Sequence, residues 1–356
     1  MKQIFNCIKR LVPCRIKKWV KYIILHEEPI TEGQEFRKGC PLFESTLVID
    51  PKRLQICCRP LTDTPDFFFF PYEGGSEESL KDAIKKYNEN KEILFEKWKK
   101  MNGGPCSKCT HLTEGMFPSK PKVNTLLLGT GFIGSVCNFK CCYCSADYYL
   151  KDDSKKINNL YETIILLSDL IDFKDIFLSL SIGEFIVRKD ADQILDFLFN
   201  KGAKLSLTSN SSVYKESVAR FIRSGRMNGI NTSLDAGTRE TFAKVKGVDC
   251  WEKVIANILK YSQIGCRYFL KYIILDSIND NEVDINGFVE VCRQVKAAEV
   301  TISADKNLKM KRLSQNALNM VILLYNKLQE NEFKILFSSN DFNEEDLKYI
   351  SNISRM

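Results

Sequence analysis

From residue 123 onward, two patterns of hydrophobic residues alternate along the chain. Short β-rich apolar runs such as "VNTLLLGT" and "AKLSLTSN" are followed by longer runs such as "ADQILDFLFNKG". The short runs are typical of strands, and in the longer runs apolar side chains recur about every three to four residues, as in helices with one buried face. Strands are therefore predicted at 123–130, 175–183, 203–210, 229–236, 267–275, 299–304 and 333–338, with helices between them.

Strands that are buried on both faces and separated by single helices predict a parallel sheet, closed or partly closed into a barrel. Six or seven βα units fit into this part of the chain. A full TIM barrel needs about eight, so we expect an α/β fold with a partial (β/α)6-type TIM barrel. In such folds the functional residues lie on the loops that follow the strands.

Residues 1–122 do not share this rhythm. "STLVID" and "LQICCR" predict a β-hairpin that turns at "PKR", and a helix is expected from about Glu77 to Lys100, capped by Ser76. We therefore expect a smaller α+β module that contains cysteines, then the α/β core, then a helix–strand–helix extension. Their predicted ranges are 1–122, 123–310 and 311–356.

Composition favours a globular protein, since 44% of the 356 residues are hydrophobic. No apolar run reaches the roughly 18 to 20 residues of a membrane helix or resembles a secretory leader, so a cytoplasmic location is expected. The net charge of +7 is spread among both signs and indicates a solvated surface, with a nucleic-acid partner as the alternative. Residues 1–25 are basic without any acidic residue, which suits a peripheral membrane contact, an acidic partner or a packed helix.

Fourteen cysteines in a chain expected in a reducing compartment favour metal or cluster ligation over disulfides. Four of them lie in "SVCNFKCCYCSA", where Cys137, Cys141 and Cys144 have the spacing C-x3-C-x2-C. Neither of the two histidines, His26 and His111, lies nearby in sequence to complete a tetrahedral zinc site. Three thiolates leave one coordination position open, which a chemically active centre needs.

This stretch resembles the signature of the radical S-adenosylmethionine (radical SAM) superfamily, C-x3-C-x-aromatic-C after the first barrel strand, with Tyr143 as the aromatic residue. The resemblance implies a partial barrel of radical SAM type. It also implies that Cys137, Cys141 and Cys144 bind three irons of a [4Fe-4S] cluster, whose fourth iron is chelated by the amino and carboxylate groups of SAM. Cys142 is then not a ligand.

Three further segments resemble family features at strand ends. "SIGEF" resembles a Gly-Gly-Glu-Pro-like segment whose backbone meets the SAM amino group; Gly183 and Glu184 match it, while Ile182 and Phe185 depart from it. "LTSNSS" resembles a Thr-Asn-Gly turn, and "TSLDAGTRETFAKVKG" resembles a Ser-Leu-Asp stretch followed by a basic-Gly pair. Helix capping is the alternative role for such residues. The resemblance, which covers roughly residues 123 to 305, makes Asn210 a candidate pocket residue and places three more near SAM or substrate: Ser233, Asp235 and Lys246.

The remaining cysteine pattern lies in the N-terminal module and resembles the hairpin of SPASM and twitch auxiliary-cluster domains, which usually follow the barrel. Here it precedes the barrel, and Lys52 and Arg53 replace the turn glycine. It predicts a second, auxiliary Fe-S cluster, with either Cys57 or Cys58 as a ligand. A structural zinc site that includes His111 and plain buried thiols are the alternatives. The candidate ligands are Cys40, Cys57, Cys58, Cys106 and Cys109.

The resemblance implies an enzyme that reductively cleaves SAM to a 5′-deoxyadenosyl radical, which abstracts hydrogen from a substrate, with a reductant such as flavodoxin or ferredoxin as partner. An auxiliary cluster suits a dehydrogenation or a peptide or sugar modification. A peptide or protein is the first expectation for the substrate, a carbohydrate or other small metabolite the second, and RNA the third. A zinc- or Fe-S-stabilised binding protein without catalysis is the alternative of a different class.

Overall fold

The computed structural model describes residues 34–50, 53–56, 69–73, 76–100, 112–120, 123–128, 137–144, 160–174, 176–180, 183–305, 307 and 311–354. The chain divides into two compact units. The first comprises Met1–Val48 with Lys52–Thr125, and the second comprises Ile49–Pro51 with Leu126–Met356. Among the residues described, no helix is both long enough and apolar enough to span a membrane.

The first unit contains two groups of paired strands and a short helix, α3 (Pro41–Ser45). In one group β1 (Gln34–Gly39) pairs antiparallel with β5 (Thr113–Pro118). In the other, β2 (Thr46–Asp50), β3 (Arg53–Gln55) and β4 (Phe69–Pro71) are neighbours in that order. The two strands of the predicted hairpin, β2 and β3, therefore lie side by side.

The long helix α4 (Glu77–Lys100) begins where the sequence predicts. The backbone N–H of Ser79 donates to Ser76 Oγ at 3.2 Å, which satisfies one of the unpaired donors of the first turn. The helix buries Leu80, Ala83 and Tyr87. The ring of Tyr87 meets the edge of Phe70, from the "FFFF" run, with 5.8 Å between centroids.

The second unit is built on strands that follow one another in the sheet in chain order. The pairings from the second strand to the last are all parallel, as predicted. This order is that of a partial βα barrel. The strands are β6 (Thr125–Leu128), β7 (Phe177–Leu180), β8 (Lys204–Thr208), β9 (Met227–Ser233), β10 (Tyr268–Ile274), β11 (Glu299–Ala304) and β12 (Ile335–Phe337).

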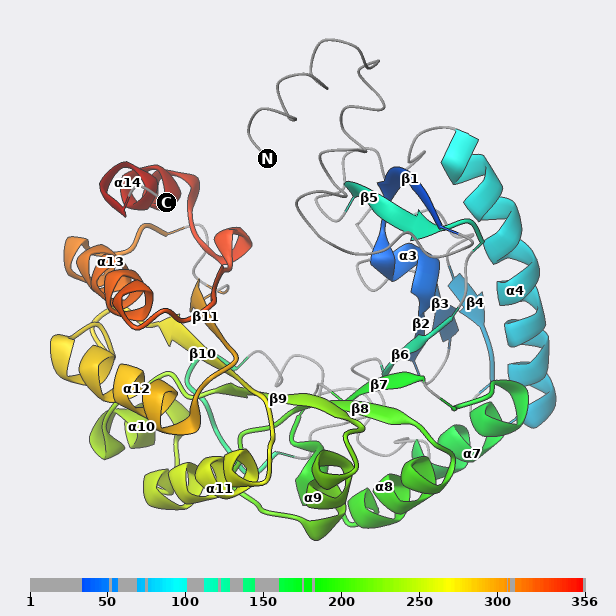
Figure 1. Cartoon of the computed structure of the whole chain (residues 1–356), viewed down its shortest axis with the longest axis horizontal. Helices are drawn as coiled ribbons and strands as arrows, with labels where there is room; N and C mark the ends of the chain where they lie inside the picture. Colours follow the sequence, from blue (N-terminus) through cyan, green and yellow to red (C-terminus); the bar gives the residue numbers. More distant parts are fainter. Residues whose placement is uncertain are drawn as a thin grey trace, which may run out of the picture. The chain divides into compact units, whose positions relative to one another are not determined.

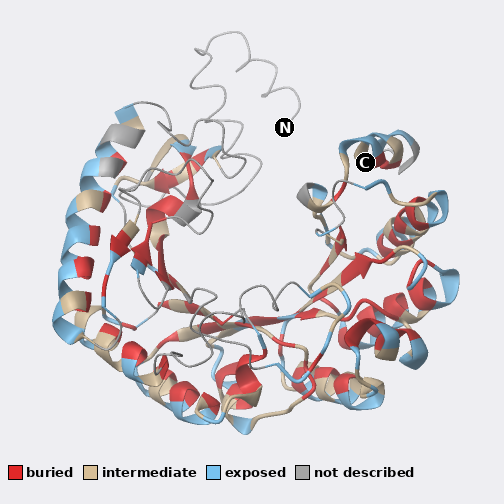
Figure 2. Ribbon diagram, turned by 180° about the vertical axis from the view of Figure 1, so that it is seen from behind, coloured by how far each residue is buried: buried red, intermediate tan, exposed pale blue. Residues whose placement is uncertain are grey.

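Helices of the second unit cover the outer side of this sheet (Figure 1). In these helices the buried residues lie on the side of the strands and the exposed residues on the outer side (Figure 2), which is the pattern expected for amphipathic helices. The helices are α7 (Leu160–Leu170), α8 (Ala191–Asn200), α9 (Glu216–Arg223), α10 (Arg239–Lys246), α11 (Trp251–Gln263), α12 (Glu282–Val295), α13 (Gln315–Glu330) and α14 (Glu344–Ser354). Two single turns, η3 (Phe185–Val187) and η5 (Ser339–Asp341), complete the unit.

Two details differ from the sequence-based prediction. Several strands end earlier than expected, as at Thr208 and Ser233, because the polar residues that follow them form turns and hydrogen bonds between loops. The helix α10 lies in a segment where no helix is predicted from the sequence. It is only eight residues long, is capped by Thr238, whose hydroxyl accepts from Thr241 N, and buries Phe242 and Val245. Both differences lie at the carboxyl ends of the strands.

Candidate cluster-binding site

Residues 137–144, here called the cysteine loop, are attached to the C-terminal end of α10. Lys140 N donates to Lys246 O and Cys142 N donates to Val245 O, both at 2.9 Å. Within the loop, Cys144 N donates to Cys141 O at 3.0 Å. The last carbonyls of a helix have no partner inside the helix. The cysteine loop therefore satisfies the end of α10 and is itself fixed by it.

Gly247 permits this close approach. Its φ of 68° is left-handed, which is the usual conformation of a residue just past a helix end. A Cβ atom at this position would lie 2.6 Å from Lys140 O. A side chain at residue 247 would therefore push the cysteine loop away from α10.

The three cysteines of the C-x3-C-x2-C spacing gather at this end of the sheet. Cys137 and Cys144 are exposed and Cys141 is half-buried, and each thiol lies within electrostatic reach of the others. Burial raises the pKa of the Cys141 thiol to about 11, although Lys246 acts in the opposite direction. Phe139 N donates to Cys137 Sγ at 3.4 Å.

This donor set fits a cluster better than a single ion. Over the described part of the chain, no group of three His, Cys, Asp or Glu side chains is arranged to hold one metal ion. A structural zinc needs four ligands around one atom. In a [4Fe-4S] cluster each thiolate binds a different iron, so the sulfurs need not converge on one point. The three thiols of the cysteine loop match that requirement.

Behind the cysteine loop, Tyr143 joins a buried ion pair. Lys246 Nζ lies 2.5 Å from Asp235 Oδ2, and these two residues are 2% and 0% exposed. The Tyr143 hydroxyl donates to the same Oδ2 at 2.5 Å and accepts from Lys246 Nζ at 2.8 Å. Asp235 Oδ1 accepts from Ile273 N at 2.7 Å. Both carboxylate oxygens of Asp235 are thus occupied within the protein, as is the ammonium group of Lys246.

A second polar group lies where β7 and β8 end. Glu184 is 1% exposed and accepts from Ser209 Oγ at 2.8 Å and from Asn210 N at 2.5 Å. Burial raises the pKa of Glu184 to about 7, although these hydrogen bonds act in the opposite direction. Gly183, just before it, is exposed and has a φ of 63°. This geometry requires glycine or strain.

Asn210 extends this group to the cysteine loop. Its Nδ2 donates to Asn138 Oδ1 at 2.8 Å, and its Oδ1 accepts from Ser212 N at 2.9 Å. Asn138 Nδ2 in turn donates to Ser212 Oγ at 2.8 Å. Partial burial raises the pKa of the neighbouring Cys137 thiol; Glu184 adds to the rise, while the Asn210 side chain opposes it.

The predicted site residues of the barrel thus come together in two groups beside the cysteine loop. Ser233 ends β9 and is half-buried. Asp235 and Lys246 are predicted to lie near SAM or substrate; in the structure their charged groups contact each other and Tyr143. Asn138 matches no motif and could not be singled out from the sequence, although it lies between the predicted ligands Cys137 and Cys141.

The predicted auxiliary site is described at only one of its cysteines. Cys40 is 7% exposed, and its backbone N–H donates to Glu44 Oε1 at 3.1 Å. Outside the described residues lie Cys57, Cys58, Cys106, Cys109 and His111, as does the basic segment 1–25. The auxiliary cluster and the membrane contact of that segment stay predictions.

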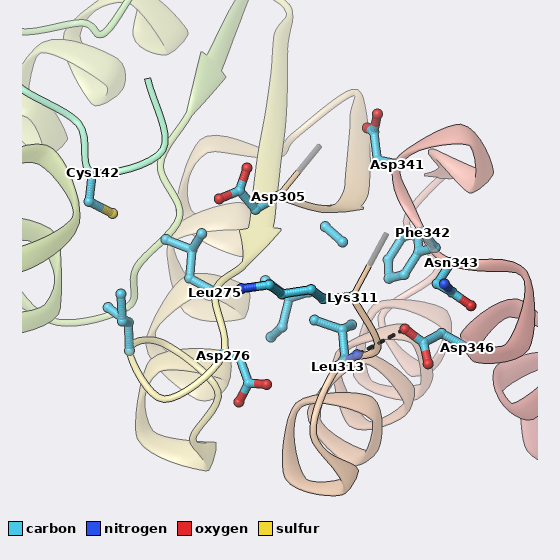
Figure 3. Close-up of a pocket in the computed structure, with 13 residues that line it drawn as sticks. Cys142, Leu275, Asp276, Asp305, Lys311, Leu313, Asp341, Phe342, Asn343 and Asp346 are labelled. Carbon is cyan, nitrogen blue, oxygen red and sulfur yellow. Dashed lines mark hydrogen bonds between the residues drawn. The ribbon is translucent and has the colours of Figure 1, made fainter. Parts of the chain in front are cut away.

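A cavity of about 140 Å³ opens at the carboxyl ends of β10 and β11. Cys142 projects toward it from the cysteine loop (Figure 3). Its apolar wall includes Leu275, Ile278 and Phe342. Its charged lining consists of Asp276, Asp305, Lys311, Asp341 and Asp346.

Two of these carboxylates accept hydrogen bonds from the backbone at Leu313, which lines the cavity, and at the next residue, Ser314. Asp346 Oδ2 accepts from Leu313 N at 3.0 Å, and Asp276 Oδ2 accepts from Ser314 N at 2.8 Å. Figure 3 shows Lys311 between the acidic side chains. The lining therefore carries four carboxylates against one ammonium group.

Comparisons with known proteins found a family match and several similar proteins. The family model of the radical SAM superfamily matches residues 132–289. The GTP 3′,8-cyclase of Nautilia profundicola is 28% identical over 154 residues, which are 42% of this chain and 48% of that protein. A probable GTP 3′,8-cyclase of Pyrococcus abyssi is 26% identical over 147 residues, 41% of this chain and 47% of that protein. The chain spans about half the length of these curated relatives.

Similar solved structures include Streptococcus suis SuiB bound to the precursor peptide SuiA, with a TM-score of 0.47 and 13% identity over 87% of this chain and 72% of that one. Another is anSMEcpe with bound AdoMet, with a TM-score of 0.44 and 15% identity over 60% of this chain and 63% of that one. Residues 132–289 of this chain match the radical SAM superfamily, and that family implies a [4Fe-4S] cluster and SAM as cofactors.

Proposed function

We propose that this chain is a radical SAM enzyme in which Cys137, Cys141 and Cys144 hold a [4Fe-4S] cluster and leave its fourth iron to SAM. The observation that carries the proposal is the cysteine loop, whose three thiols lie together on a backbone fixed to α10. When bound, the cluster and SAM supply a 5′-deoxyadenosyl radical by one-electron reduction. The protein provides position, charge and exclusion of water.

The polar groups at the ends of β7 to β9 orient SAM. Gly183 leaves its backbone exposed for the amino group of SAM. Glu184 lies behind it and holds the turn at Asn210 through the backbone N–H of that residue. Asn210 then presents its side chain beside Cys137, and Ser233 adds a polar group at the end of β9. In this proposal, Glu184 acts through Asn210 rather than by direct contact.

The cavity beside Cys142 holds part of the bound ligands. Ligands of parallel α/β folds bind at the carboxyl ends of the strands, and this cavity lies at the ends of β10 and β11. Its 140 Å³ is smaller than the roughly 300 Å³ or more of a pocket that encloses a whole small molecule. It accommodates one portion of SAM or substrate, with the remainder lying outside it.

The charge of this lining bears on the substrate class. The relatives named GTP 3′,8-cyclase suggest a purine nucleotide. The lining carries four carboxylates and one ammonium group. Arg312 pairs with Asp346 and Lys271 with Asp341, but the negative charge that remains in excess would repel a triphosphate. We therefore keep a peptide or protein as the first substrate class and a carbohydrate or other small metabolite as the second. The auxiliary cluster of the N-terminal unit and a flavodoxin or ferredoxin reductant complete the proposal.

Cleavage of SAM tests this function directly. Protein reconstituted anaerobically with iron and sulfide, then reduced with dithionite, should convert SAM to 5′-deoxyadenosine and methionine, measured by liquid chromatography and mass spectrometry. The triple variant Cys137→Ala, Cys141→Ala, Cys144→Ala should form neither product. Cys250→Ala, a cysteine substitution at the start of α11, is the matched control and should retain the activity. Iron-loaded wild type that leaves SAM intact would instead favour a binding protein without catalysis.

A further inference from the structure

Behind the cysteine loop lies a network of polar residues that are not themselves predicted cluster ligands. Its four members are Tyr143, Asp235, Lys246 and Asn279, here called the clamp. Three of them, Asp235, Lys246 and Asn279, are at most 2% exposed, and Tyr143 is half-buried. They come from the cysteine loop, the end of β9, the last turn of α10 and the turn after β10. The clamp therefore joins the cysteine loop to two strands and one helix.

Asn279 fixes the backbone from which Asp235 projects. Asp235 has a φ of 56°, in the left-handed region that residues with a Cβ atom rarely adopt. Asn279 Nδ2 donates to Asp235 O at 2.9 Å and to Ile273 O at 2.8 Å. Its Oδ1 accepts from Leu275 N at 2.7 Å. Residues in strained conformations persist only where their surroundings hold them, and Asn279 supplies that support.

The orientation of Asp235 then determines where Tyr143 lies. The ring of Tyr143 packs against Val245, Ile273 and Leu275, and its hydroxyl bridges Asp235 and Lys246. The carbonyl oxygen of Tyr143 accepts from Asn307 Nδ2 at 2.8 Å. Tyr143 is thus held at its ring, its hydroxyl and its backbone, directly between Cys142 and Cys144.

The energetics favour a specific role over simple stabilisation. Burying an ion pair costs desolvation energy that its attraction only partly offsets, so such pairs are weak evidence for stability. Where every polar atom has a hydrogen-bond partner, however, a buried polar network makes the structure rigid and selects one arrangement of its residues. In the clamp, both carboxylate oxygens of Asp235 and the Lys246 ammonium group have partners.

We propose that the clamp positions the cluster: Asp235, Lys246 and Asn279 act through Tyr143 to fix Cys141 and Cys144 relative to the sheet. This inference rests on the proposed function. These residues are positioning residues and need not touch SAM or substrate. They affect the rate at which the cluster loses iron and the surroundings of the cluster when SAM is bound.

The substitution Tyr143→Phe tests the clamp with little disturbance, because it keeps the ring and removes only the hydroxyl. The matched control is Tyr325→Phe on α13, which removes a hydroxyl that accepts from Gln329 Nε2 at 2.8 Å, away from the cysteine loop. Three quantities are compared after anaerobic reconstitution: the rate of iron loss to a chelator, the electron paramagnetic resonance spectrum of the reduced cluster with and without SAM, and the unfolding temperature.

Tyr143→Phe should lose iron about tenfold faster than wild type, the size expected for one lost hydrogen bond to a charged group. Its spectrum in the presence of SAM should differ from that of wild type, while its unfolding temperature stays close to it. Tyr325→Phe should match wild type in all three. If Tyr143→Phe matches wild type in iron loss and spectrum, the clamp proposal is overturned while the function stands. Faster iron loss with an unchanged spectrum and a matching fall in the unfolding temperature would also overturn it, because general destabilisation would then explain the iron loss. Wild type that holds no iron would overturn both.

Discussion

Each unit of this protein buries charged side chains, but their partners differ between the two units. In the second unit, the carboxylate of Asp235 and the ammonium group of Lys246 neutralise each other at the centre of the clamp. In the first unit, Lys91 forms no such ion pair with any residue that the structure describes. It is 4% exposed, and its Nζ donates to the Tyr87 hydroxyl at 2.7 Å and approaches Thr46 O at 3.4 Å. Burial lowers the pKa of Lys91 to about 7, although Glu44 acts in the opposite direction.

This shift predicts a pH dependence of stability. Between about pH 7 and pH 10 an unfolded chain keeps the proton on Lys91, since the ordinary pKa of lysine is about 10.4, while the folded chain has lost it. The unfolded state then binds more protons, so this residue makes the free energy of unfolding rise with pH across that window. Below pH 7 both states are charged, and the folded state carries the whole cost of burying the ammonium group.

Lys91→Met should therefore raise the free energy of unfolding at pH 6 by roughly 1 to 4 kcal/mol, since the buried charge is removed while the unbranched side chain is kept. It should also flatten the rise between pH 7 and pH 9. Urea unfolding followed by circular dichroism at several pH values measures both. The exposed Lys86→Met, which removes a surface pair with Asp82 on the same helix, is the control. Parallel pH profiles for wild type and Lys91→Met would refute this assignment.

At the scale of elements, the short helix α10 carries the cysteine loop. Two of its last carbonyls accept from the loop, and Gly247 leaves room for the contact. Its start could have been anticipated, because Thr238 followed by charged residues is a typical helix cap. Its attachment to residues 140 and 142 could not, because nothing local in either segment encodes a contact about a hundred residues away.

Gly247→Ala should disturb this attachment. The left-handed φ alone costs about 1 to 2 kcal/mol for a residue with a Cβ atom. Gly225→Ala is the matched control, because its φ is 71° but a Cβ there meets nothing within 4 Å. Both variants should lose stability in urea unfolding. Only Gly247→Ala, whose Cβ would displace Lys140 O, should also retain less iron after reconstitution. Equal iron contents would show that the cysteine loop does not depend on this contact.

The strands and outer helices of the second unit follow the hydrophobic periods closely, which is why the sequence predicts the parallel sheet. Strand ends are predicted less well. At "LTSNSS" and "TSLDA" the apolar pattern fades gradually, while the structure ends β8 at Thr208 and β9 at Ser233. The residues beyond these points bond to other loops instead of to neighbouring strands, as Asn210 does to Asn138. Such bonds depend on which strands are adjacent, and no local pattern contains that information.

At the scale of the whole molecule, the spacing of the cysteines predicts a cluster site, but it does not predict all of the residues that surround that site. The C-x3-C-x2-C motif is local, so Cys137, Cys141 and Cys144 could be predicted as cluster ligands without knowledge of the fold. Asn279 carries no motif, and its role emerges only because the turn after β10 lies beside the end of β9. Asp235 and Lys246 could be located but not oriented, because the direction of a buried side chain is set by tertiary packing.

Metal analysis tests the central claim most directly. Iron, zinc and acid-labile sulfide are measured in anaerobically purified and reconstituted wild type, in the triple variant Cys137→Ala, Cys141→Ala, Cys144→Ala, and in Cys142→Ala. The triple variant should lose about four irons per chain with their sulfide, the content of one [4Fe-4S] cluster, and Cys142→Ala should lose none. Zinc in place of iron in the wild type, or a triple variant with unchanged iron, would contradict the account.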